Sequence, residues 1–263
     1  MKKLLYVALA LLLCAVMAFT GCSLGGGEKE KSGGSVVDNG EIPSIATGLG
    51  FRSDLEIQSE SAQIESEQPI GSQAKAFLDG VFYFEGTVFT MDNEGMDMKM
   101  ATDANKNLQL ETTLEEITIT FLILDKQPYL INKKDNTYIE VNARLLSILG
   151  IDTDSLTEIS NFTSNTNASM DDDTTVTQTA VLINGEEGLC TEILYKTDDG
   201  KDNSVKLYTI GEKLCQAENF DEKGNMTMQM AFTTFSPTIP SDQLTLAGYT
   251  KATYYSFIQS LVG

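Results

Sequence analysis

The sequence predicts a mainly β (α+β) protein: a curved antiparallel sheet, or half-barrel, of about 10–11 strands with a few covering helices. Three observations predict this class. From Phe77 onward, short apolar segments are separated by turn residues, as in antiparallel sheets. Within several segments, apolar and polar residues alternate, which is the side-chain period of a strand. The segments also follow one another too closely for the crossover connections that parallel strands need.

The first half of the predicted sheet is a meander of about six strands. They are 80–91, 96–101, 108–114, 117–124, 129–132 and 137–141. The segment ITITFLIL at 117–124 is the most apolar of these strands, which is typical of a central strand. In 96–101 methionine alternates with charged residues, so its methionines share one face.

The second half repeats this pattern with five strands. They are 175–183, 189–196, 205–210, 214–220 and 226–235. The segment MTMQM at 226–230 resembles MDMKM at 96–100, and each follows an acidic turn that contains glycine. Either the domain contains two similar halves, or two strands face one interior.

Helices are predicted at 72–78 and, after an N-cap-like Asn142, up to Gly150. A short helix is also predicted at 155–160. At the C-terminus, five apolar residues with helical spacing predict an amphipathic helix. They are Tyr254, Tyr255, Ile258, Leu261 and Val262.

The N-terminus has the layout of a secretory signal. Two lysines precede an uncharged run from Leu4 to Thr20. Phe19-Thr20-Gly21-Cys22 then resembles the lipobox of bacterial lipoproteins, although Phe19 stands where leucine is usual. This resemblance implies cleavage before Cys22 and a diacylglyceryl anchor with acyl groups such as palmitate at Cys22. The alternative is an uncleaved signal anchor. We therefore expect an extracytoplasmic protein attached by lipid to the cell membrane.

These features divide the chain into a lipoprotein signal peptide (1–21), a flexible tether (22–48), a polar lead-in segment (49–69) and an antiparallel β domain (70–263). The tether is predicted because glycine, serine and alternating charges cannot bury enough apolar surface to fold. The β domain is long enough for one sizeable core.

The chain is strongly acidic, with a net charge of −20. Loss of residues 1–21 would remove two lysines and no acidic residue, which makes the charge −22. Such a charge repels phosphate backbones, so nucleic acid is excluded as an expected partner.

Four cysteines are present, of which Cys14 would leave with the signal and Cys22 would be acylated. Cys190 and Cys215 remain as a possible disulfide outside the cytoplasm. If one strand lies between theirs, their backbones would be about 9–10 Å apart, too far to bridge.

The strand pattern resembles the LolA/LolB/LppX-like group of lipoprotein and lipid carriers, including Gram-positive-type lipoproteins of unassigned function. The resemblance covers residues 70–250. It is carried by FYFEGTVFTMDNEGMDMKM, ITITFLILDKQPYLINKKDNTYIEV, VKLYTIGEKLCQAENFDEKGNMTMQM and PSDQLTLAGYTK. It implies a LolA-like fold and lipid binding between sheet and helices. A protein anchored by its own lipid would not shuttle as LolA does.

The methionines are the best functional indication, because methionine is flexible and adapts to variable apolar ligands. The residues expected to line an apolar site are Phe82, Phe84, Met96, Met98, Met100, Met226, Met228 and Met230. Two interpretations stay open: a lipid-lined cavity, or an ordinary core filled with methionine. A third is Cu(I) binding by thioethers. The corresponding functions are lipid binding, or a structural or interaction role in the cell envelope with a solid core.

We expect no enzyme activity, no cofactor and no resident metal. The chain has no histidine, which excludes Ser-His and Cys-His pairs and imidazole ligands. Ser72-Gln73-Ala74-Lys75 matches S-x-x-K but lacks the companion motifs of penicillin-interacting enzymes. The acidic runs at 171–173 and 198–199 lack the spacing of an EF-hand loop.

Overall fold

The structure, a computed structural model, describes residues 55–63, 69–90, 93–114, 117–142, 174–196 and 200–262. Its first seven strands are β1 (Ile57–Gln63), β2 (Phe82–Thr90), β3 (Asn93–Thr102), β4 (Leu108–Leu114), β5 (Ile117–Leu124), β6 (Gln127–Asn132) and β7 (Thr137–Glu140). The later ones are β8 (Thr175–Ile183), β9 (Glu186–Lys196), β10 (Asp202–Ile210), β11 (Lys213–Phe220), β12 (Met226–Ser236) and β13 (Thr250–Lys251). The helices of this part of the chain are α2 (Ser72–Leu78) and α5 (Tyr254–Val262).

All these strands form one sheet of 13 strands, in the order β1-β8-β9-β10-β11-β12-β2-β3-β4-β5-β6-β7-β13. The sheet is open, since β1 and β13 are its two edges. The predicted fold class is confirmed, and each predicted strand corresponds to one of β2 to β12. The edge strands β1 and β13 were not predicted.

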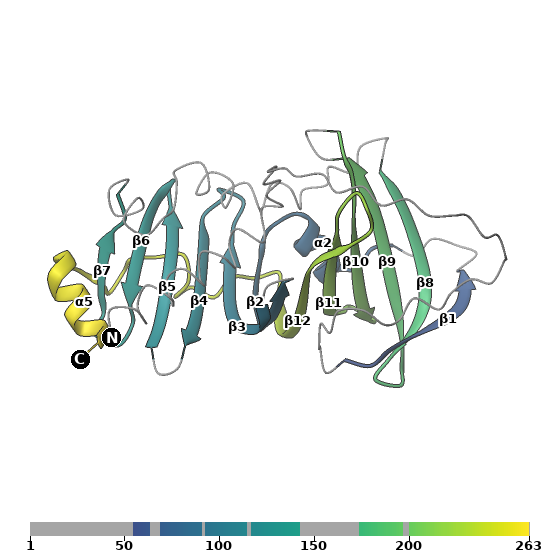
Figure 1. Ribbon diagram of the computed structural model, residues 1–263, viewed down its shortest axis with the longest axis horizontal. Helices are drawn as coiled ribbons and strands as arrows, with labels where there is room; N and C mark the ends of the chain where they lie inside the picture. The colour runs from purple at the N-terminus through teal and green to yellow at the C-terminus, as the bar shows by residue number, and fades with distance from the viewer. Residues whose placement is uncertain are drawn as a thin grey trace, which may run out of the picture.

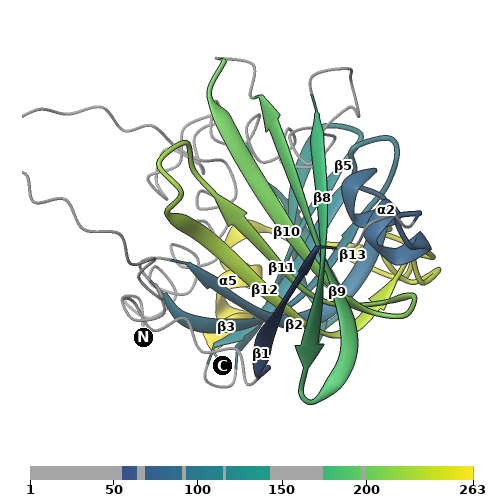
Figure 2. The same cartoon turned by 90° about the vertical axis from the view of Figure 1, so that its right-hand side faces the viewer.

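Two meanders make up the sheet, β2–β7 and β8–β12, and they lie side by side in Figure 1. The pairing of β2 with β12 joins them, so residues far apart in sequence meet in the middle. Strand β1 crosses to the far edge and pairs with β8. Figure 2, viewed from that edge, shows how strongly the strands are twisted from one meander to the other.

A β-bulge interrupts the junction of β2 and β12, between Phe232 and Thr234. Gly86 lies opposite this bulge, and a Cβ added there would lie 2.0 Å from the carbonyl oxygen of Ala231. The Thr233 hydroxyl, on the bulged residue, donates to the Glu85 carbonyl at 2.8 Å. Glycine is therefore required for the two backbones to approach this closely.

The main core lies on one face of the sheet, which we call the inner face. It contains buried residues of both meanders, such as Phe84, Phe121, Leu207 and Met230. The opposite, outer face carries the alternating polar residues of β2 and β3, such as Glu85. Period-two alternation thus divides β3 into a methionine side and a charged side.

Helix α2 covers the inner face near the junction of β12 and β2 (Figure 1). It agrees with the prediction at both ends. Its Phe77 is fully buried and stacks on Phe82, with ring centroids 5.4 Å apart. Two contacts hold the start of the helix against the β10–β11 hairpin. Glu212 accepts from Ser72, and Gln73 Oε1 accepts from the Leu214 amide at 2.9 Å.

After β12, residues 237–249 run across the outer face to β13 (Figure 1). The amide of Leu244 donates to Gln109 Oε1 at 3.0 Å, and Gln109 is buried. Strand β13 pairs in parallel with β7. We call residues 237–249 the outer strap.

The C-terminal helix forms as predicted, but its buried side differs from the predicted stripe. Tyr254 and Tyr255 are 48% and 72% exposed, whereas Phe257 is 1% exposed and belongs to the main core. Ile258 packs partly against that core. Among its neighbours in the sheet the helix contacts β6 and β7.

Several predictions lie outside the described residues: the signal peptide and Cys22, the tether, the helices at 142–150 and 155–160, and the acidic run at 171–173. Within the residues that are described, no helix has the length and apolar character needed to span a membrane.

Candidate functional site

The methionines of β3 and β12 form the first candidate site, on the inner face. Their exposed fractions are 5% for Met96, 2% for Met98 and 1% for Met100, Met228 and Met230. These five, with Phe82 and Phe84, belong to one buried cluster. Met226 is partly exposed at the start of β12. The structure therefore brings together all the predicted lining residues except Met226, and we call this group the methionine cluster.

Strand β2 lies between the two methionine strands and supplies the contacts between them. Val88 is opposite both Met96 and Met230. Met98 is opposite Gly86, which leaves the centre of the cluster without a side chain from β2. The internal echo in the sequence therefore marks two strands that face one interior.

Phenylalanines close the cluster beside α2. The rings of Phe82 and Phe235 stack at 5.4 Å, and those of Phe84 and Phe232 meet edge to face at 5.3 Å. Such ring pairs stabilise beyond the area that they bury. The group is apolar and polarisable, and it offers no acid, base or nucleophile.

Cys190 and Cys215 lie on β9 and β11, with β10 between them, and both are free thiols. With one strand between them, the backbones of the two cysteines are expected to be too far apart for a disulfide. Burial raises the pKa of Cys190 to about 11 and also raises the pKa of Cys215. Because a thiolate is the reactive form, both groups are weak nucleophiles at neutral pH.

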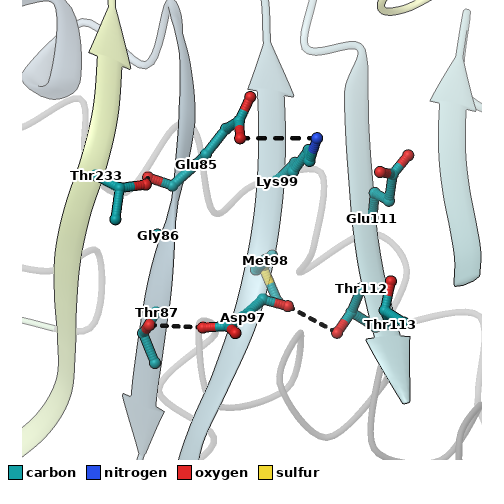
Figure 3. A pocket seen from close by; sticks show the side chains of 10 residues that line it. All are labelled: Glu85, Gly86, Thr87, Asp97, Met98, Lys99, Glu111, Thr112, Thr113 and Thr233. Carbon is teal, nitrogen blue, oxygen red and sulfur yellow. Dashed lines mark hydrogen bonds and ion pairs between the residues drawn. The ribbon is translucent and has the colours of Figure 1, made fainter. Parts of the chain in front are cut away.

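A second candidate lies on the outer face of β2, β3 and β4, where an open groove of about 290 Å³ crosses the strands. Figure 3 shows its residues. Glu85, Gly86, Thr87, Asp97, Met98, Lys99, Glu111, Thr112, Thr113 and Thr233 line it. We call it the outer groove. These residues form no recognisable motif in the sequence, although the alternation in MDMKM already placed Asp97 and Lys99 opposite the methionines.

Strand register explains the shape of the outer groove. Gly86, Met98 and Thr112 are opposite one another in neighbouring strands; the side chains of Met98 and Thr112 point inward, and Gly86 has none. Their backbones therefore form a floor. The rows on either side, Glu85-Lys99-Glu111 and Thr87-Asp97-Thr113, project outward and form two walls.

Most charged groups of the outer groove are paired. Lys99 Nζ is 3.7 Å from Glu85, and Lys133 forms an ion pair with Glu111. Asp97 accepts through Oδ1 from the Thr87 hydroxyl at 2.7 Å. In the described part of the chain, Oδ2 of Asp97 has no hydrogen-bond donor. The outer groove thus combines one uncompensated carboxylate with hydroxyls and one ammonium group.

The S-x-x-K residues do not meet. The Ser72 hydroxyl donates to Glu212 Oε2 at 2.9 Å, and the Ser72 amide donates to the same oxygen at 2.8 Å. Lys75 instead pairs with Asp79 at 3.6 Å. A carboxylate at the start of α2 satisfies free N–H groups there, so this motif is a helix start. Among the residues that the structure describes, no three His, Cys, Asp or Glu side chains are grouped to hold a metal.

No protein-family model matches the chain, and no curated protein does. Solved structures that resemble it include the Pseudomonas aeruginosa MucA/MucB complex, with 10% identity and a TM-score of 0.34. That match covers 65% of this chain and 57% of the other, so the chain spans little more than half of it. An uncharacterized conserved protein from Thermus thermophilus has 11% identity and a TM-score of 0.31, over 68% of this chain and 97% of the other.

Proposed function

We propose that this protein is an extracytoplasmic lipoprotein, anchored to the cell membrane through Cys22, that binds a lipid or other apolar molecule on the inner face of its sheet. One observation supports an apolar ligand: methionines from two separated strands lie with phenylalanines in one cluster. Flexible thioether side chains adapt to apolar groups of variable shape. The protein is not an enzyme in this proposal.

The anchor rests on the sequence around Cys22. Two buried acyl chains give stable attachment, because each methylene contributes about 0.8 kcal/mol and one chain alone is marginal. Expression in a bacterium fed labelled palmitate tests it. We expect label in the native chain and in Cys14→Ser, and none in Cys22→Ser. Equal labelling of both variants would contradict the anchor.

The ligand is tested by extracting the purified full chain with organic solvent and identifying non-covalent lipid by mass spectrometry. Met98→Phe adds bulk to the methionine cluster, whereas Lys99→Gln changes the next residue on the outer face. We expect bound lipid in the native chain and in Lys99→Gln, and less in Met98→Phe. If no lipid is extracted and the chain takes up no fluorescent fatty-acid analogue, the proposal is wrong. Metal analysis of the same samples tests Cu(I).

A second candidate is a structural or interaction lipoprotein of the cell envelope with a solid core and no ligand. The exposed fractions of 1–5% in the methionine cluster favour it, because closely packed side chains leave little surface for a ligand. In that case Met98→Phe would overpack the core and lower stability by about 1–3 kcal/mol, with no lipid in any sample.

A further inference from the structure

The outer groove lies on the face of the sheet opposite the proposed apolar site. We propose that it binds a neutral, hydroxyl-rich ligand, such as a short uncharged oligosaccharide. The walls of this site alternate along the same strands with residues of the methionine cluster, and Met98, in the floor, is the residue that the two share.

The shape of the outer groove suits a slender ligand lying across the strands. Its walls come from positions two residues apart, so they are about 6.6–6.8 Å apart along the strands. From β12 to β4 the groove crosses three strand spacings, or about 14 Å. A chain of a few sugar rings matches this length and would lie over the two walls, facing the floor between them. The floor of Gly86, Met98 and Thr112 has no outward side chain that would obstruct it.

Hydrogen-bonding capacity favours a ligand that both donates and accepts. The Oδ2 of Asp97 accepts, as do the lone pairs of the Thr87 and Thr233 hydroxyls, whose protons go to Asp97 and to the Glu85 carbonyl. Lys99, with one ion pair at 3.7 Å, keeps donor capacity for a ligand oxygen. A sugar hydroxyl is a donor and an acceptor in one group, so it matches both.

Charge favours a neutral ligand over an amine or an anion. Lys99 compensates Glu85, and Lys133 compensates Glu111, which leaves only Asp97 in the walls without a basic partner. An ammonium ligand would be repelled by the ammonium group of Lys99, which lies between the carboxylates of Glu85 and Glu111. An anionic ligand would be repelled by a chain with a net charge of −20.

Binding can be measured by isothermal titration of the full chain, kept in a detergent that contains no sugar. The probes are chitotetraose and cellotetraose, with spermidine as the cationic comparison. We expect at least one tetrasaccharide to bind, with the same affinity at low and high salt, because neutral ligands are not screened. Binding of spermidine alone, or of none of the three probes, would overturn the proposal.

Matched variants locate the site. Asp97→Asn and Lys99→Met each remove a charged partner of the ligand, and each should weaken sugar binding about tenfold or more. Asp202→Asn changes an exposed aspartate outside the outer groove, at the start of β10, where its partner is Lys196, and should have no effect. Because all three side chains are largely exposed, we expect unchanged unfolding temperatures. Equal affinity of all three variants would place the sugar elsewhere and contradict the assignment, whatever happens to lipid binding.

Discussion

Met96 of β3 and Met230 of β12 lie opposite the same residue, Val88 of β2, one on each side of it. The two methionines are 134 positions apart in the chain, as their numbers show. Both are at most 5% exposed and share one buried cluster. The pairing of Met230 with Val88 joins the two meanders at the middle of the sheet, so these side chains contribute to the stability of the whole domain.

Met96→Ala and Met230→Ala should therefore each lower the free energy of unfolding by about 2–5 kcal/mol, through lost burial and the cavity left behind. Urea unfolding measures this loss. The control is Met226→Ala on the same strand as Met230, where the side chain is partly exposed and the loss should be smaller. Equal losses at all three positions would show that the methionine cluster is not a packed core.

The faces of β3 and β12 could be predicted because apolar and polar residues alternate there one by one. The joining of β12 to β2 could not, because that pairing depends on the path of the whole chain and leaves no local pattern. The edge strand β1 has the sequence IQSESAQ, whose polar residues do not suggest a strand. Backbone pairing with β8, rather than an apolar pattern in its own sequence, makes this segment a strand.

The same limit applies to the outer groove and to α5. The alternation in MDMKM placed Asp97 and Lys99 away from the core, but only the strand register shows that Glu111 continues the row of Lys99. In α5 the helical spacing predicted the helix, whereas the position of β6 and β7 decides that Phe257 is the buried residue.

Gly86→Ala should destabilise the domain strongly, by about 3 kcal/mol or more, because the new Cβ would overlap the Ala231 carbonyl in the β-bulge. Gly185→Ala is the control. Gly185 has a φ of +80° but open space around it, so the cost there is only the left-handed backbone, about 1–2 kcal/mol. Thermal unfolding of both variants compares the two effects. A loss at Gly86 no larger than that at Gly185 would mean that the bulge can relax.

The start of α2 should make stability depend on pH through Glu212. Hydrogen bonds from the Ser72 amide and hydroxyl hold the pKa of Glu212 below its ordinary value of 4.5. A lowered pKa in the folded state stabilises above the unfolded value, and this stabilisation is lost as the pH falls through the folded value. Glu212→Gln should therefore lower the unfolding temperature at neutral pH and have little effect in acid below both pKa values.

Thermal unfolding between neutral pH and about pH 3 measures this difference. Glu222→Gln is the control for the change in net charge, because Glu222 is an exposed acid in the next turn along the chain. If Glu222→Gln shows the same pH dependence, the effect comes from general charge repulsion and the cap is not responsible.

Two hairpin turns have the same hydrogen-bond pattern but should differ in how much they contribute to the stability of the domain. Asp103 accepts from the amides of Asn105 and Asn107 and from the Asn107 side chain. Asp221 accepts from Lys223 and Asn225 in the same way. Asn107, however, is 7% exposed, and its Oδ1 also accepts from the Asp125 amide at 2.8 Å. The first turn therefore also holds the β5–β6 turn in place.

Asp103→Ala should accordingly cost about 1–3 kcal/mol, since it releases polar groups that are partly buried. Asp221→Ala should cost less, because water replaces the lost partners at an exposed turn. Urea unfolding compares the two variants, and Asn107→Ala should resemble Asp103→Ala if the connection to Asp125 is responsible. Equal losses for Asp103→Ala and Asp221→Ala would show that each aspartate stabilises only its own hairpin.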